Sequence, residues 1–313
     1  MRYYLRKLIG LVVTLVLVSL VTFFVFQILP GDPALIILGV DADEYQIEAL
    51  NRSLGLDRPL SERYISWLKG IFSGDLGTSI RYNQSVSYLI GEGLKVTSLL
   101  SLYSMVFTIA IGLPIGLFLA SHSKRKYSIP VSIISQLSLS IPSFCMGIFL
   151  ISIFSVRLNL LPSVGYTPPS EGLFASFKSL LLPSLSVAIG SSAILIRYVK
   201  VSVLKESGKD YVRTARSKGM SKGRIMYVHV LKNSLIPVIT ILGLLTADIL
   251  GGSIIVENIF SLPGIGRLIT VSISSRDLPL IQALVLYLAL IVVVCNFIVD
   301  LIYSLVDPRI RLR

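Results

Sequence analysis

Few residues in this sequence are of types and spacings that could do chemistry, and the clearest is Asp248. It stands in the apolar segment TADILGG. A carboxyl in such a segment costs free energy to hold, so its position makes it a candidate for lining the path of a transported molecule. A structural acid, hydrogen-bonded between helices, is the competing interpretation.

The other reactive side chains do not form a recognisable catalytic or metal site. His122 and His229 lack a neighbouring arrangement of Cys, Asp or Glu that would indicate zinc or a nucleophile. Cys145 and Cys295 lack paired CxxC spacing, and we interpret them as packing residues. No GxxxxGK[ST] phosphate loop occurs, which excludes ATP hydrolysis by that route. We therefore predict no catalytic residue, no metal site and no cofactor in this chain.

The densest group of basic residues lies between two apolar spans, in the segment DYVRTARSKGMSKGRIMYVHVLKNSLIPVIT at positions 210–240. Asp210 is expected to cap a short helix, because its side-chain oxygen can accept from the first backbone amides. Gly219 is expected to close that helix in the left-handed conformation. Ser221 is expected to cap the next helix, which runs into the following span.

One side of this short helix carries small residues. Val212, Ala215 and Gly219 fall at i, i+3 and i+7 and therefore share a side. A small residue and a glycine there would let another protein approach closely. Positive charges border this side: Arg213, Arg216 and Lys218. The alternative is a solvated basic loop without a partner.

The elements that must position these residues are membrane spans. Hydrophobic residues make up 53% of the chain and charged residues 15%, against roughly 25% charged in a typical soluble domain. Six stretches reach the roughly 20 apolar residues that cross a bilayer as a helix. They are Leu8–Leu29, Val96–Ala120, Ile129–Phe154, Leu181–Val203, Ser234–Val256 and Leu280–Tyr303. The sequence therefore predicts an all-α integral membrane protein with six transmembrane helices.

Prolines lie within or near the start of several of these spans. A proline removes a backbone hydrogen bond and can kink its helix. We therefore consider four positions as possible kinks: Pro114, Pro142, Pro183 and Pro237.

The lysines and arginines are distributed unevenly between the two sides of the membrane. Nineteen of the 29 fall on one side: Arg2, Arg6, Lys7, Lys124, Arg125, Lys126, the ten between Arg197 and Lys232, Arg309, Arg311 and Arg313. The positive-inside rule then places both termini in the cytoplasm. The net charge of +12 follows from this topology, so no nucleic-acid partner is needed to explain it.

By position, the chain divides into four parts. Residues 1–29 hold the cytoplasmic N-terminus and the first span. Residues 30–95 form an extracytoplasmic cap segment with predicted helices at 43–54 and 60–72. Residues 96–306 form the five-helix core, which includes the basic loop at 204–233, and residues 307–313 are a cytoplasmic tail. The cap is either packed on the helices or a platform for an external partner.

Several strings of this sequence resemble the permeases of ATP-binding-cassette importers, specifically the first permease type of the peptide and nickel group. The basic loop is similar to the family's EAA loop through Ala215, Gly219, His229, Asn233 and Pro237. The segments LPGDPA, LGLDRPL and GDLGTSIR, and the terminal DPR, are similar too. After the fifth span, GGSIIVENIFSLPGIGRL carries the signature residues Glu257, Phe260, Pro263, Gly264 and Gly266. The resemblance covers nearly the whole chain.

The chain also departs from the general importer pattern. Arg213-Thr214 replaces the glutamate–alanine start of the loop, and this replacement is typical of the peptide group. Lys232 stands where the general motif has proline, so details that depend on that proline are not carried over.

The resemblance implies the six-helix fold of a type I importer permease in a bacterial or archaeal cytoplasmic membrane. It implies a second, homologous permease, two ATP-binding subunits that hold ATP and Mg²⁺, and an extracytoplasmic substrate-binding protein. The basic loop would be the helix that couples to the ATPase, through Asp210, Tyr211, Val212, Arg213, Thr214, Ala215, Arg216, Lys218 and Gly219. The cargo would be a di- or oligopeptide or, alternatively, nickel or a nickel chelate.

The main competing hypothesis is a secondary transporter driven by an ion gradient, with Asp248 as the coupling acid. It would need no ATPase subunit, but it leaves the similarity of the basic loop unexplained.

Overall fold

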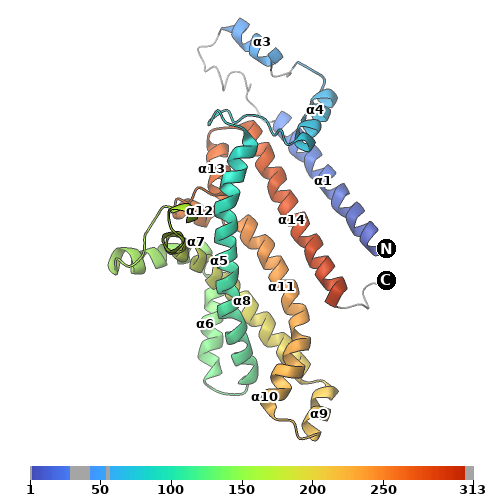
Figure 1. The fold of residues 1–313 in the computed structure, drawn as a ribbon, viewed down its shortest axis with the longest axis vertical. Coiled ribbons are helices and arrows are strands. Elements are labelled where there is room, and N and C mark those ends of the chain that lie inside the picture. Colours follow the sequence, from blue (N-terminus) through green and yellow to red (C-terminus); the bar gives the residue numbers. More distant parts are fainter. Residues whose placement is uncertain (1, 29–42, 54–56, 307–313) are drawn as a thin grey trace. The chain divides into compact units, whose positions relative to one another are not determined.

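The computed structural model describes residues 2–28, 43–53 and 57–306, and this part of the chain is helical (Figure 1). The long helices are α1 (Arg2–Ile28), α5 (Val86–Ser121), α8 (Leu173–Ser207), α11 (Leu231–Gly252) and α14 (Leu278–Val306). The shorter ones are α3 (Glu44–Ser53), α4 (Leu60–Ser73), α6 (Ser128–Ser140), α7 (Ser143–Leu150), α9 (Asp210–Ser217), α10 (Lys222–Arg224), α12 (Ile254–Ile259) and α13 (Ile265–Ser274). Two π-helices, η1 (Ile151–Arg157) and η3 (Ile225–Val230), and a 3₁₀ turn, η2 (Pro169–Glu171), complete the set. The predicted all-α fold is confirmed.

The apolar helices match the predicted spans with one correction. Five helices are long and apolar enough to cross a membrane: Arg6–Val25, Val86–Ser121, Leu173–Ser207, Lys222–Gly251 and Leu278–Val299. The predicted span Ile129–Phe154 is present as a bent pair of helices, because α6 and the segment Ser143–Arg157 meet at 105°. The described residues therefore contain five spans, or six if this bent pair counts as one.

The bend arises at Ile141-Pro142. A residue before proline avoids the helical conformation, because the proline ring clashes with its backbone. Ile141 accordingly ends α6 in an extended conformation, with φ −90° and ψ 117°. By contrast, Pro114, Pro183 and Pro237 lie inside helices that continue through them.

The chain forms two compact units that are not consecutive in sequence. One contains residues 1–96 and 263–293, and the other contains residues 97–262 and 294–313. Residues 263–293 thus group with residues 1–96, although they fall within the predicted five-helix core at 96–306.

In the first unit, α4 packs on α1 through aromatic rings. Phe23 is buried, and its ring centroid lies 5.3 Å from that of Tyr64 and 5.7 Å from that of Trp67. Ser19 and the Tyr64 hydroxyl are hydrogen-bonded at 2.8 Å. The predicted helix at 60–72 is confirmed, and it is held to the first span by both apolar and polar contacts.

Asp277, which was not among the predicted site residues, links the start of α14 to residues 79–81 in the first unit. Its side chain is buried and accepts hydrogen bonds from the Ser79 hydroxyl and from the backbone amide of Arg81, the latter at 3.2 Å. It also accepts from the Leu280 amide at 3.4 Å, as an N-cap residue does. The signal was present, since an aspartate followed by a proline two residues later, as in RDLP, is typical of a helix start.

In the second unit, α8 is the central helix and packs against α6, α7 and α11. Two glycines bring α5 close to it. A methyl group on Gly112 would lie 2.7 Å from the Leu195 side chain, and one on Gly116 would lie 2.7 Å from the Val199 side chain. Because such distances exclude any Cβ, these glycines set how closely α5 and α8 approach.

Candidate functional site

The basic loop folds as two short helices, α9 and α10, at one end of α8 and α11 (Figure 1). The expected cap by Asp210 is wrong. The N-cap residue of α9 is Lys209, and Asp210 is the first helical residue and makes no side-chain cap hydrogen bond. Its carboxylate still lies in the first turn, where the helix dipole favours negative charge. The expected cap of the next helix is confirmed, because the Ser221 hydroxyl accepts from the Arg224 amide at 3.4 Å.

The end of α9 is closed by the glycine that the sequence indicated. Gly219 has φ +78°, in the left-handed region. Its amide donates to the Arg216 carbonyl at 3.0 Å, and the Met220 amide donates to the Ala215 carbonyl at 3.3 Å. These two bonds form a Schellman motif, which satisfies carbonyls at the helix end and turns the chain sharply.

The side of α9 that carries Val212 and Ala215 faces the interior of this chain. Val212 is 3% exposed and Ala215 is 8% exposed. They pack in one apolar cluster with residues of α8, η3 and α11: Leu195, Val199, Val203, Ile225, Val230, Val238, Ile241 and Leu245. The expectation that this side meets another protein is therefore wrong for these two residues. The physical reason for their burial is that Val212 and Ala215 are the aliphatic residues of an otherwise polar helix, so they pack against the apolar residues of this chain.

The opposite side of α9 is exposed. Asp210, Arg213, Thr214 and Ser217 fall at i, i+3, i+4 and i+7, and all four are exposed. We call these four residues the outer stripe. Arg213 and Asp210 approach to 3.6 Å, but both side chains are largely solvated, so this pair contributes little stability. A partner of the basic loop would contact the outer stripe.

A polar cluster fixes the turn between α8 and α9. Glu206 accepts from the Lys209 ammonium at 2.5 Å and from the Tyr211 hydroxyl at 3.0 Å. The hydrogen bond to Glu206 raises the pKa of Lys209, and burial raises the pKa of the Tyr211 phenol. Both groups therefore stay protonated at neutral pH and remain donors to Glu206.

At the other end of α11, the signature residues Glu257 and Phe260 lie on and just after α12. Glu257 is fully buried, and one of its carboxylate oxygens accepts from the Thr97 hydroxyl at 2.8 Å and from the Ser253 hydroxyl at 2.9 Å. This buried acid links α12 to α5. The arrangement satisfies a group that would be costly to bury without partners.

Phe260 anchors a loop from elsewhere in the second unit. Its ring packs on α7, where a methyl group on Gly147 would lie 3.0 Å from it. Its carbonyl accepts from the Gly165 amide at 2.9 Å. Gly165 has φ +98°, which favours glycine. Phe260 thus holds the loop 158–172 against the end of the spans.

The remaining signature residues begin the next helix. Gly264 is the N-cap residue of α13, and Gly266 is buried in its first turn. A methyl group on Gly93 would lie 3.2 Å from the Ile265 amide nitrogen and 3.3 Å from the Gly264 carbonyl carbon, so α5 begins in close contact with this turn. Pro263, just before it, is exposed.

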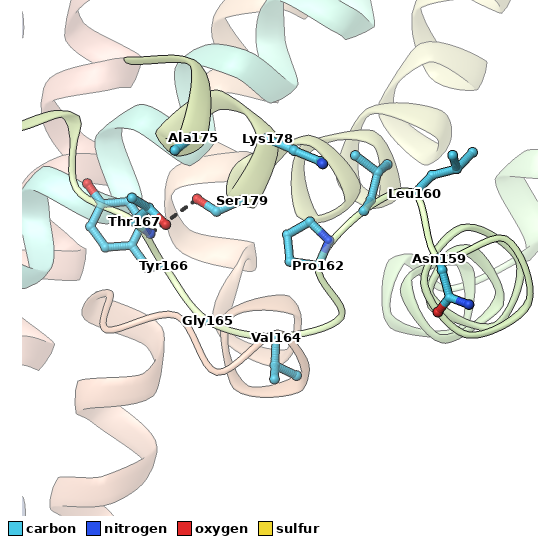
Figure 2. A pocket seen from close by; sticks show the side chains of 11 residues that line it. Asn159, Leu160, Pro162, Val164, Gly165, Tyr166, Thr167, Ala175, Lys178 and Ser179 are labelled. Carbon is cyan, nitrogen blue, oxygen red and sulfur yellow. Dashed lines mark hydrogen bonds between the residues drawn. The ribbon is translucent and has the colours of Figure 1, made fainter. Parts of the chain in front are cut away.

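A pocket of about 590 Å³ lies beside the loop 158–172 (Figure 2). Lys178 and Ser179 on α8 form one wall, and Asn159, Pro162 and Tyr166 belong to the loop. The Ser179 hydroxyl accepts from the Thr167 amide at 3.3 Å. The pocket combines one cationic group with an aromatic ring and with the amide or hydroxyl groups of Asn159, Thr167 and Ser179.

Asp248 lies on α11 with an exposed side chain. The described part of the chain provides it with no hydrogen-bond or ion-pair partner. It is therefore not a structural acid buried between helices of this chain. Cys145 is exposed and Cys295 is half-buried, and both are free; the interpretation as a packing residue is therefore wrong for Cys145. Among residues 2–28, 43–53 and 57–306, no three His, Cys, Asp or Glu side chains form a group that could hold a metal ion.

Comparison with known proteins defines the class. The family model described as binding-protein-dependent transport system inner membrane component matches residues 112–312, and the model of its N-terminal region matches residues 1–94. The chain therefore belongs to this family of multi-pass inner membrane transport components.

Among its relatives is a putative peptide transport system permease protein of Brucella abortus strain 2308, 36% identical over 307 residues and covering 98% of each chain. The glutathione transport system permease protein of Escherichia coli K12 is 36% identical over 313 residues, the full length of both. Two inward-facing structures of the MetNI methionine ABC transporter share the fold, with TM-scores of 0.58 and 0.60 at 18% and 19% identity. Each covers 70% of this chain and 97% of the transporter chain.

Proposed function

We propose that this chain is the membrane permease subunit of an ATP-driven importer, and that it passes peptides delivered by an extracytoplasmic binding protein. Family membership supports the importer class, and the relatives named as peptide and glutathione permeases support the cargo class. Nickel or a nickel chelate is the alternative cargo within the same group.

The observation that carries the proposal is how α9 is built. Its inner side belongs to an apolar cluster that also contains residues of α8 and α11, whereas the outer stripe is polar and exposed. Packed interiors are dense and transmit displacement. A partner that moves the outer stripe therefore moves both long helices.

That partner, in this proposal, is an ATP-binding subunit. A second, homologous permease would complete the pore, and each permease would rest on one ATPase. ATP and its Mg²⁺ would bind to those subunits. When ATP draws the two ATPases together, the rigid-body motion would pass through α9 into the spans. The distribution of lysine and arginine supports the corresponding orientation, with the basic loop and both termini in the cytoplasm.

A bulky substitution on the outer stripe tests this mechanism. Thr214→Trp and Ser217→Trp should each reduce co-purified ATPase at least about tenfold, because a close interface loses its fit when a large side chain intrudes at its centre. ATP-dependent uptake should fall with it. The matched control is Ser123→Trp, an exposed serine in the other short basic loop, which should leave both measurements unchanged.

Normal ATPase binding and normal uptake in both α9 variants would show that the basic loop has no such partner. Uptake that needs an ion gradient and no ATPase would instead favour a secondary transporter.

A further inference from the structure

Two adjacent stripes of α11 differ sharply in burial. Val238, Leu245 and Ile249 follow a spacing of i, i+7 and i+11 and are buried. Pro237, Leu244 and Asp248 follow the same spacing one residue earlier and are exposed. Asp248 therefore belongs to a face that the described residues leave uncovered. It is also the one charged residue between Lys232 and Glu257.

The position of Asp248 restricts what can cover this face. It lies within the apolar span Lys222–Gly251, where a carboxylate that faces lipid is unfavourable. A tightly packed protein interface would have to bury the charge and supply a partner for it. A water-filled path is the surrounding in which a lone carboxylate keeps its charge at least cost.

The described residues leave space beside the carboxyl. Gly251 lies one turn further along α11, at i+3 from Asp248, and a methyl group placed on it would meet nothing within 4 Å. On the other side, Leu244 lies one turn earlier and is 46% exposed. The carboxyl thus stands between an apolar side chain and open space, with room for a cationic group to approach.

We propose that Asp248 lines the transport path and pairs with the positively charged amino terminus of a passing peptide. This inference rests on the proposed function. The amino-terminal ammonium is the cation that every unmodified peptide carries, whatever its side chains. A carboxylate in the path therefore recognises the class without selecting among its members.

Charge-selective labelling tests whether Asp248 faces water. Leu244→Cys is placed in a chain in which Cys145 and Cys295 are replaced by serine, and the assembled importer is reconstituted in liposomes. A cationic and an anionic methanethiosulfonate reagent of similar size are then compared. With Asp248 present, the cation should react about threefold faster and the anion about threefold slower than with Asp248→Asn, from Coulomb's law at ~6 Å in water. Leu245→Cys, which is 3% exposed in the wild type, is the control and should be unreactive.

Transport of matched peptides tests the recognition step. Asp248→Asn should reduce uptake of a peptide with a free amino terminus by about tenfold, the effect of losing a charge-assisted hydrogen bond. Uptake of the same peptide with an acetylated amino terminus, measured in the same liposomes, should be unchanged by the substitution. Asp248→Glu should restore uptake of the free peptide.

Three results would overturn the inference. Leu244→Cys unreactive with both reagents would place this face against lipid or the second permease. If Leu244→Cys reacts but its labelling rates are the same with and without Asp248→Asn, Asp248 has no electrostatic role at this site. If Asp248→Asn lowers uptake of the free and the acetylated peptide equally, Asp248 does not recognise the amino terminus. In each case, retained ATPase binding and ATP-dependent uptake of the wild type would leave the proposed function standing, whereas ATP-independent uptake by the wild type would refute that function itself.

Discussion

The two ends of α11 are held by different interactions, apolar packing at one end and hydrogen bonds at the other. At the basic end, α9 and η3 join α8 and α11 through apolar side chains, and the charges lie on the outside. At the α12 end, a buried carboxylate on Glu257 and the carbonyl of Phe260 hold α5 and the loop 158–172 by hydrogen bonds.

The difference indicates two mechanical roles. Apolar packing is non-directional, so the basic end can shift as a body while keeping most of its contacts. Hydrogen bonds to a buried carboxylate require fixed geometry, and leaving one donor unpaired costs about 1–3 kcal/mol. The geometry of the α12 end is therefore more strictly fixed than that of the basic end.

The largest expected effect separates the two ends by side of the membrane. In a chain without Cys145 and Cys295, Ser217→Cys at the basic end should not react with an impermeant thiol reagent added outside intact cells. Ser170→Cys in the loop 158–172 should react fully. This loop precedes the span α8 and α9 follows that span, so the two cysteines lie on opposite sides of the membrane. Both serines are exposed. Labelling of Ser217→Cys from outside would overturn the orientation with the termini inside.

A substitution at Glu257 tests how strictly the α12 end is specified. Glu257→Ala should destabilise the purified protein by about 3 kcal/mol, because the Thr97 and Ser253 hydroxyls lose their acceptor in a buried place. Glu257→Gln keeps an oxygen in the same position and should lose less than half as much. Thermal unfolding in detergent measures both. Equal losses of stability in Glu257→Ala and Glu257→Gln would mean that the charge matters more than the hydrogen bonds. Hydrogen-bond geometry would then not distinguish the α12 end from the basic end.

The smallest expected effect concerns the turn after α9. Gly219→Ala should cost about 1 kcal/mol, because φ +78° strains any residue with a Cβ. No atom lies within 4 Å of the added methyl group, so the cost is backbone strain alone. Gly223→Ala is the matched control, since it also has open space but no positive φ. Because Gly223 lies in α10, alanine there should not destabilise the protein and should stabilise it by up to about 1 kcal/mol. Thermal unfolding with equal losses at both positions would contradict the assignment of strain to Gly219.

Local patterns were sufficient for much of this molecule. The apolar stretches predicted the spans, because a helix in a bilayer is defined by composition over about 20 residues. The glycine at the end of α9 and the serine before α10 were predicted correctly, because turn and cap preferences act within a few residues. Pro142 carried the signal for the bend in the third span, but three similar prolines produced none. Proline chemistry alone therefore does not decide where a helix breaks.

By itself, the sequence determined the class of protein, the spans and the basic loop with its turn residues. Only the tertiary structure decided which side of α9 is covered, that Glu257 is buried with hydrogen-bond partners and that the Asp248 side chain is exposed. The reason is that burial depends on residues distant in the chain. Ala215 is small enough for either a partner surface or an internal core, and only its packing in one apolar cluster with residues of α8, η3 and α11 assigns it to the core.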